Sequence, residues 1–162
     1  MKTKELVLSA LCIVLSACTA MAADPVVYLD WNAAKKQLVE VSITDYAVYK
    51  GETTLAAGTT YVVNKGGTLT DRITVSGTAE NPTRLILCDG VTFNVPKGVT
   101  VYAKDATTNA LVICGQKLGT GALVVTSDIG TGNSAGIGGY YPAPISAPCG
   151  GIITINGGTV TV

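Results

Sequence analysis

The sequence predicts an all-β solenoid, a parallel β-helix in which short strands stack coil upon coil. Two observations carry this prediction. Apolar β segments alternate with glycine corners throughout 61–162, and a motif of three apolar-rich residues, a corner and a second β segment recurs four times. Val, Ile and Thr dominate because branching at Cβ suits a half-buried pleated surface, and glycine accepts the positive φ of corners. A β-sandwich with frequent turns is the alternative.

The four copies of the motif are unevenly spaced. They are YVVNKGGTL from Tyr61, LILCDGVTFNV from Leu85, LVICGQKLGTGALVV from Leu111 and ITINGGTVTV from Ile153. Two more segments, ITVSG from Ile73 and VTVYA from Val99, have strand character with less complete corners. Because Leu111 to Ile153 is the longest interval, loops are expected on one side of the stack, where repeat proteins often bind their ligands.

Composition agrees with one β-rich domain. The chain has 162 residues, 19 of them glycine, and only 14% are charged, which argues against a helical bundle. Outside the amino-terminal leader, helix is expected only as a turn or two around Trp31 to Val41. Residues 23–60 are therefore expected to form a cap or linker, and 61–162 the repeat region.

The first 22 residues predict a secretory signal peptide. Lys2 and Lys4 give a positive start and the segment from Leu6 to Ala17 is apolar, a layout typical of exported proteins. Two processing signals overlap: an AxA site that ends at Ala22, and a lipobox-like LSAC that would place a lipid on Cys18. With either signal the protein is exported from the cytoplasm. Cleavage after Ala22 would release it to the extracellular space, and a lipid on Cys18 would hold it at the cell surface as an outer-membrane lipoprotein.

Charge gives no indication of a nucleic-acid partner. The chain has 11 basic and 11 acidic residues; loss of Lys2, Lys4 and Glu5 with the leader leaves 11 − 2 = 9 and 11 − 1 = 10, a net charge of minus one. Only Arg72 and Arg84 offer guanidinium groups to phosphate, and no basic patch is visible. No cofactor is expected either.

Three cysteines remain beyond the leader: Cys88, Cys114 and Cys149. Cys88 and Cys114 each follow an apolar triplet, LIL or LVI, so adjacent coils would stack them about 4.8 Å apart. That separation allows a Cys88–Cys114 disulfide in an oxidising compartment, and it equally allows two buried thiols that act as small apolar groups. With no CxxC pair and no histidine, a zinc site is not expected.

The absence of histidine also argues against catalysis. Ser/His/Asp and Cys/His systems are excluded in their usual forms, and glycoside hydrolysis needs two carboxylates that face one bond. The acidic residues of the repeat region stand singly; they include Asp71, Glu80, Asp89, Asp105 and Asp128. A polysaccharide lyase that used Arg72 or Arg84 as its base is the remaining enzymatic hypothesis.

Ligand binding is the more economical function. The segment 139–151 interrupts the repeat and places Tyr140 beside Tyr141 among three prolines. Exposed tyrosine rings stack on sugar rings, although these two could equally cover the apolar side of the stack. Three further aromatic residues are expected to cover its amino-terminal end: Trp31, Tyr46 and Tyr49.

These residues resemble a known type of protein. The successive LILCDG, AGIGG and ITINGGTVT motifs, within about Tyr28 to Val162, are similar to the repeats of large secreted or surface-attached bacterial proteins, the carbohydrate-binding-domain or adhesin-like proteins. The resemblance implies a right-handed parallel β-helix and carries over no binding residues. Such proteins usually continue with further copies, whereas this sequence stops at Val162 in mid-strand, so a truncated chain is expected.

Three functions follow from these observations. The leading one is a non-catalytic module of the cell surface or the secreted space that binds glycans or mediates adhesion. The second is a structural stalk or spacer of a larger surface protein, and the third a lyase-like or hydrolase-like enzyme. Contact with a membrane is expected only through a lipid on Cys18, and the uncharged TVTV edge at the carboxyl end is expected to favour self-association.

Overall fold

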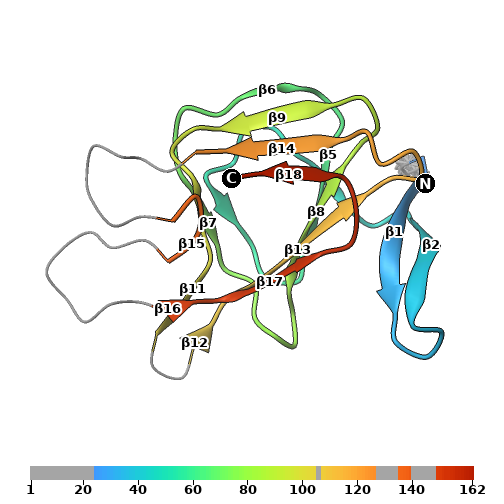
Figure 1. The fold of residues 1–162 in the computed structure, drawn as a ribbon, viewed down its shortest axis with the longest axis horizontal. Helices are drawn as coiled ribbons and strands as arrows, with labels where there is room; N and C mark the ends of the chain where they lie inside the picture. The colour runs from blue at the N-terminus through green and yellow to red at the C-terminus, as the bar shows by residue number, and fades with distance from the viewer. Residues whose placement is uncertain (1–23, 105–106, 127–134, 140–148) are drawn as a thin grey trace, which may run out of the picture.

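The computed structural model describes residues 24–104, 107–126, 135–139 and 149–162. These residues form an all-β fold in which no helix occurs (Figure 1). Most strands belong to three parallel sheets that the chain visits in turn, coil after coil. This agrees with a β-helix or solenoid, and it differs from a β-sandwich, whose sheets are antiparallel.

The three parallel sheets hold thirteen of the strands. The first sheet contains β3 (Ala47–Val48), β5 (Thr60–Val63), β8 (Thr83–Leu87), β13 (Ala110–Gly115) and β17 (Ile152–Ile155). The second sheet contains β6 (Gly67–Thr68), β9 (Thr92–Val95), β14 (Ala122–Val125) and β18 (Thr159–Thr161). The third sheet contains β4 (Thr54–Leu55), β7 (Ile73–Val75), β10 (Val99–Thr100) and β15 (Ile137–Gly138).

The core lies inside the three sheets, because alternate residues of each strand point inward. In the first sheet Tyr61, Leu85 and Ile113 stack in register, and all three are buried. Residues of the other two sheets complete this core: Leu55, Ile73, Val75, Phe93, Val95, Val99, Leu123 and Val125. Val, Ile and Leu fill these positions since a parallel sheet is dry on its inner face.

An antiparallel hairpin covers the outer face of the first sheet. Its strands are β1 (Val26–Asn32) and β2 (Gln37–Ile43). Tyr28 on the inner side of β1 packs with Val62, Ile86 and Cys114, which point outward from the parallel sheet. The helix expected around Trp31 to Val41 is therefore wrong: VVYLDWN and QLVEVSI alternate with a period of two around a turn at 33–36.

The parallel stack begins earlier than residue 61. β3 pairs with β5 and β4 with β7, so the first coil lies within the segment 23–60 that the sequence assigned to a cap or linker. Both strands are two residues long, too short to stand out as apolar runs. Only the hairpin, which ends at Ile43, is a separate amino-terminal element.

A second antiparallel sheet lies on one side of the stack. It joins β11 (Tyr102–Lys104), β12 (Thr107–Thr108) and β16 (Cys149–Gly150). Figure 1 shows these strands near β15, on the side of the stack away from the hairpin. The long interval before Ile153 contains β16, a strand outside the three parallel sheets, while 127–134 and 140–148 lie outside the described residues, so the insertion of loops there stays a prediction.

The repeat copies stack, but one register differs from expectation. Leu111 lies opposite Ile153 as the motif predicts, whereas Leu85 lies opposite Ile113, two residues further along. A shift of two keeps the same side chains pointing inward. As a result Cys114 pairs with Ile86, so the expected stacking of Cys88 on Cys114 is wrong.

Candidate functional site

The residues that the sequence favoured for binding lie in parts of the chain that the structure does not describe. Tyr140 and Tyr141 lie outside the described residues, as does Cys18, the candidate for lipidation. Within the described part of the chain, Trp31 is the one exposed aromatic side chain, with 54% of its surface accessible. The candidate site is therefore built around Trp31.

Trp31 lies on the outer face of the hairpin. Because strand residues alternate, Val27, Leu29 and Trp31 point away from the stack while Tyr28 and Asp30 point toward it. Leu38 lies directly opposite Trp31 on β2 and is also exposed. We call Val27, Leu29, Trp31 and Leu38 the Trp31 face; it is a short apolar strip open to solvent.

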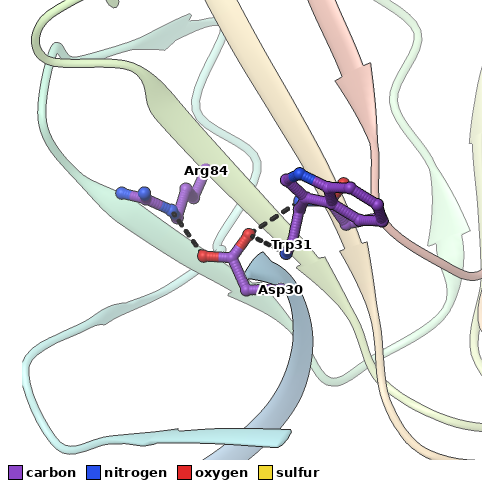
Figure 2. Close-up of polar contacts among 4 residues, drawn as sticks. Asp30, Trp31 and Arg84 are labelled. Carbon is purple, nitrogen blue, oxygen red and sulfur yellow. Dashed lines mark hydrogen bonds and ion pairs between the residues drawn. The ribbon is translucent and has the colours of Figure 1, made fainter. Parts of the chain in front are cut away.

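A polar cluster behind this face holds β1 against the stack (Figure 2). Asp30 Oδ1 accepts hydrogen bonds from the side-chain amide of Asn156 at 2.7 Å and from the backbone N–H of Trp31 at 2.9 Å. Its other oxygen lies 3.9 Å from Nε of Arg84, an atom with no hydrogen-bond partner of its own. One carboxylate thus joins β1 to β8 and to the corner after β17, next to the exposed indole.

Polar groups border the Trp31 face. Lys117 Nζ lies 3.1 Å from Glu40 Oε1, and Glu40 is the cross-strand neighbour of Leu29. Gln116 donates a hydrogen bond from Nε2 to the carbonyl oxygen of Val27 at 3.1 Å. The corner that carries Gln116 and Lys117 therefore fixes the edge of the hairpin and supplies an acidic and a basic group at its rim.

The aromatic cover at the start of the stack is only partly as expected. Tyr49 packs with its ring 5.0 Å from that of Phe93 and 6.5 Å from that of Tyr61, so it does cover the core. Tyr46 packs in the cluster between hairpin and sheet. Trp31 takes no part in this cover, so the expectation for this residue is wrong.

Cys88 and Cys114 are free thiols, so the structure has no disulfide between them. Cys114 is fully buried against the hairpin, and this burial, with the nearby Asp30 charge, raises the pKa of its thiol to about 12. Burial followed by the Asp89 charge also raises the pKa of Cys88. Both behave as small apolar groups rather than as nucleophiles.

Groups considered for catalysis take part in contacts between coils. Asp89 accepts hydrogen bonds from the backbone N–H groups of Leu118 and Thr120, both at 3.1 Å. Asp71 pairs with Lys97 at 3.6 Å. Arg72 donates from Nε to Thr100 Oγ1 at 2.7 Å and from Nη2 to the carbonyl of Ala135 at 2.8 Å. Among the described residues no group of three or more Cys, Asp or Glu side chains could hold a metal ion.

No protein-family model, curated protein or solved structure matches the chain. Within the described ranges, no helix is long and apolar enough to cross a membrane.

Sequence reasoning missed the Trp31 face because it missed the hairpin. The signal was present: in VVYLDWN the residues Val27, Leu29 and Trp31 share one strand face, and Tyr28 shares the other with Asp30. Had the turn at 33–36 been recognised, the same alternation would have placed Trp31 on the face of β1 that points away from the stack, since Tyr28 lies on the buried face.

Proposed function

We propose that this chain is a non-catalytic carbohydrate-binding module of a secreted or cell-surface protein, built as a right-handed parallel β-helix. The observation that carries the proposal is the exposed Trp31 ring on a hairpin that is fixed to the stack through Asp30. The signal-like leader supports the location outside the cell, and the LILCDG and ITINGGTVT motifs support the repeat type.

The Trp31 face suits a sugar ring. An indole offers a broad flat surface with an N–H at its edge, and the apolar C–H face of a pyranose stacks on such a ring. Leu38 extends the surface across the hairpin, while Glu40 and Lys117 lie at the rim and can exchange hydrogen bonds with hydroxyl groups. Because β1 is tied to β8 and to Asn156, the backbone that carries the ring is held in place before a ligand arrives, which lowers the entropic cost of binding.

Trp31→Ala tests this proposal. On an array of neutral and charged glycans the wild-type protein should bind a subset. The variant should lose about five- to tenfold in affinity, since an aromatic stacking contact contributes about 1–1.5 kcal/mol. Trp31→Phe is the matched control, because it keeps a flat ring at the same position and should retain part of the binding.

The result that would overturn this site is binding unchanged by Trp31→Ala. If Tyr140→Ala together with Tyr141→Ala then abolished binding, the glycan site would belong to the segment 139–151 instead. If the wild-type protein bound no glycan at all, the binding function itself would be wrong.

A structural stalk or spacer is the second candidate, and one observation favours it. The strands β17 and β18 are edge strands whose inward positions Ile153 and Ile155 are exposed. Such an edge accepts another coil, as the units of a spacer require. A spacer needs no glycan, so the array result separates the two functions.

A further inference from the structure

The first coil of the stack skips one of the three sheets. After β3 the chain passes through 49–53 directly to β4, and it contributes no strand to the second sheet. That sheet therefore starts with β6, one coil later, and β6 is its edge strand. The missing strand leaves the outermost side of β6 uncovered.

A hollow of about 240 Å³ lies at this place. Its lining consists of Tyr49, Lys50 and Gly51 on one side and of 65–69 with Phe93 on the other. Phe93 is 4% exposed and closes the floor, and the Tyr49 ring packs against it. The Tyr49 hydroxyl donates to the carbonyl of Glu52 at 3.0 Å, which fixes the ring as a wall.

The charged residues that line the hollow are basic. Lys50 and Lys65 are its two charged lining residues, and no acidic side chain lines it. Glu52, the acid next in sequence, accepts the backbone N–H of Lys50 at 2.8 Å. Among the described ion pairs, which join Arg84, Lys97 and Lys117 to acids, neither of the two lysines takes part.

Two glycines keep the hollow open. A Cβ on Gly51 or on Gly67 would meet nothing within 4 Å, so a side chain at either position would extend into free space. Gly67 lies in β6 with an ordinary φ, and no backbone constraint in the fold requires glycine there. A larger side chain at position 67 would therefore fill the hollow.

We propose that this hollow binds a carboxylate-bearing sugar ring, with the carboxylate held by Lys50 and Lys65 and the ring against Tyr49. Two ammonium groups without carboxylate partners favour an anion, the aromatic wall favours a ring, and pockets for larger ligands measure roughly 300–1,000 Å³. The proposal rests on the glycan-binding function above, and it adds a second subsite, separate from the Trp31 face, that selects acidic glycans.

The test compares a β-1,4-linked oligomer of glucuronate with the matching oligomer of glucose by calorimetric titration of the full chain. The glucuronate oligomer should bind more tightly, and Lys50→Gln with Lys65→Gln should weaken it by about tenfold or more, the effect of losing charge-assisted hydrogen bonds. Gly67→Val, which fills the hollow and leaves the charges in place, should weaken it as well. Lys35→Gln, an exposed lysine in the hairpin turn, is the control and should change nothing.

Each other result has a distinct meaning. If the glucose oligomer binds equally well, or if the two lysine substitutions and Gly67→Val leave glucuronate binding intact, the hollow is not the subsite, while loss of binding in Trp31→Ala would still support the glycan-binding function. If inorganic sulfate at the same ionic strength displaces the oligomer completely, the hollow binds a simple anion, and the assignment of a sugar ring as its ligand is wrong. If neither oligomer binds, both proposals fail.

Discussion

Glycine serves two purposes at the corners of the stack. At Gly90 and Gly157 the backbone φ is 76° and 145°, in the range that side chains with a Cβ rarely adopt. At Gly121 the constraint is space, because a Cβ there would lie 2.6 Å from the carbonyl oxygen of Cys88 in the neighbouring coil. Corners of the second kind let one coil lie directly on the next.

Gly121→Ala is expected to lower the free energy of unfolding by about 1–3 kcal/mol, since the main chain of the adjacent coil must shift to accept the methyl group. Gly67→Ala is the matched control, because its Cβ would meet nothing within 4 Å, and its effect should stay within about 0.5 kcal/mol. Urea denaturation measures both values. Equal stability of the two variants would contradict the close approach at Gly121.

The Cys114 thiol should resist alkylation in the native protein. Burial raises its pKa to about 12 from 9.0, so at pH 9 only about one molecule in a thousand carries the reactive thiolate, and the side chain is fully covered. In the unfolded chain, where the pKa returns toward 9.0, about half is thiolate at the same pH. Raising the pH through this window therefore favours the unfolded state.

Peptide mapping after treatment with iodoacetamide measures this protection at each cysteine. Cys114 should remain unmodified at pH 9 in buffer and become modified in concentrated urea, and partly exposed Cys88 should react at an intermediate rate. Rapid modification of Cys114 without urea would show that the hairpin does not cover it.

Among the elements, the hairpin depends on contacts that span the chain. Asp30 joins it to Arg84 and Asn156, far away in sequence, and Tyr28 packs on the outward residues of the first sheet. The parallel sheets make no use of β1 and β2 in their own pairing. The hairpin is therefore a unit that can open while the stack stays folded.

Asp30→Ala is expected to release the hairpin. Loss of the carboxylate removes a charge-assisted hydrogen bond, worth about 1.5–3 kcal/mol, so amide exchange in β1 and β2 should become roughly tenfold faster or more. Exchange at Leu85 to Leu87 in β8 should not change. Trp31 is the single tryptophan, so its fluorescence reports the same event.

Glu40→Gln is the control for this experiment. It removes the ion pair with Lys117. The side chains of Lys117 and Glu40 are 77% and 48% exposed, and ion pairs this open to water contribute about 1 kcal/mol at most. Uniformly faster exchange across hairpin and stack in Asp30→Ala would mean that the two unfold together.

How far the sequence predicted the fold differs from element to element. The motif copies were visible because Val, Ile and Leu recur with glycine corners, and the pairing of Leu111 with Ile153 follows from them. The register between Leu85 and Ile113 was not predictable, because a slip of two residues leaves the inward pattern unchanged. The contact of Asp30 with Asn156 joins residues whose meeting depends on the number of coils, which local pattern does not encode.

At the scale of the whole molecule, the last described coil leaves core positions open. Ile153 and Ile155 lie in register with the buried Leu111 and Ile113, yet they are 37% and 53% exposed. β17 and β18 are also edge strands, so one side of their backbone lacks a strand partner. A second copy that placed a strand along this edge would cover both the apolar side chains and the backbone groups.

A chain of these 162 residues is therefore expected to self-associate, and Ile155→Lys should shift it toward the monomer, because a buried ammonium group at the junction would lose its hydration. Leu118→Lys is the matched control: Leu118 is 75% exposed on the corner between β13 and β14 and does not belong to either edge strand, so its replacement should leave association unchanged. Sedimentation velocity across a range of concentrations measures the effect. A wild-type protein that stayed monomeric at high concentration, or a loss of association equal in both variants, would show that the edge formed by β17 and β18 is not where the copies meet.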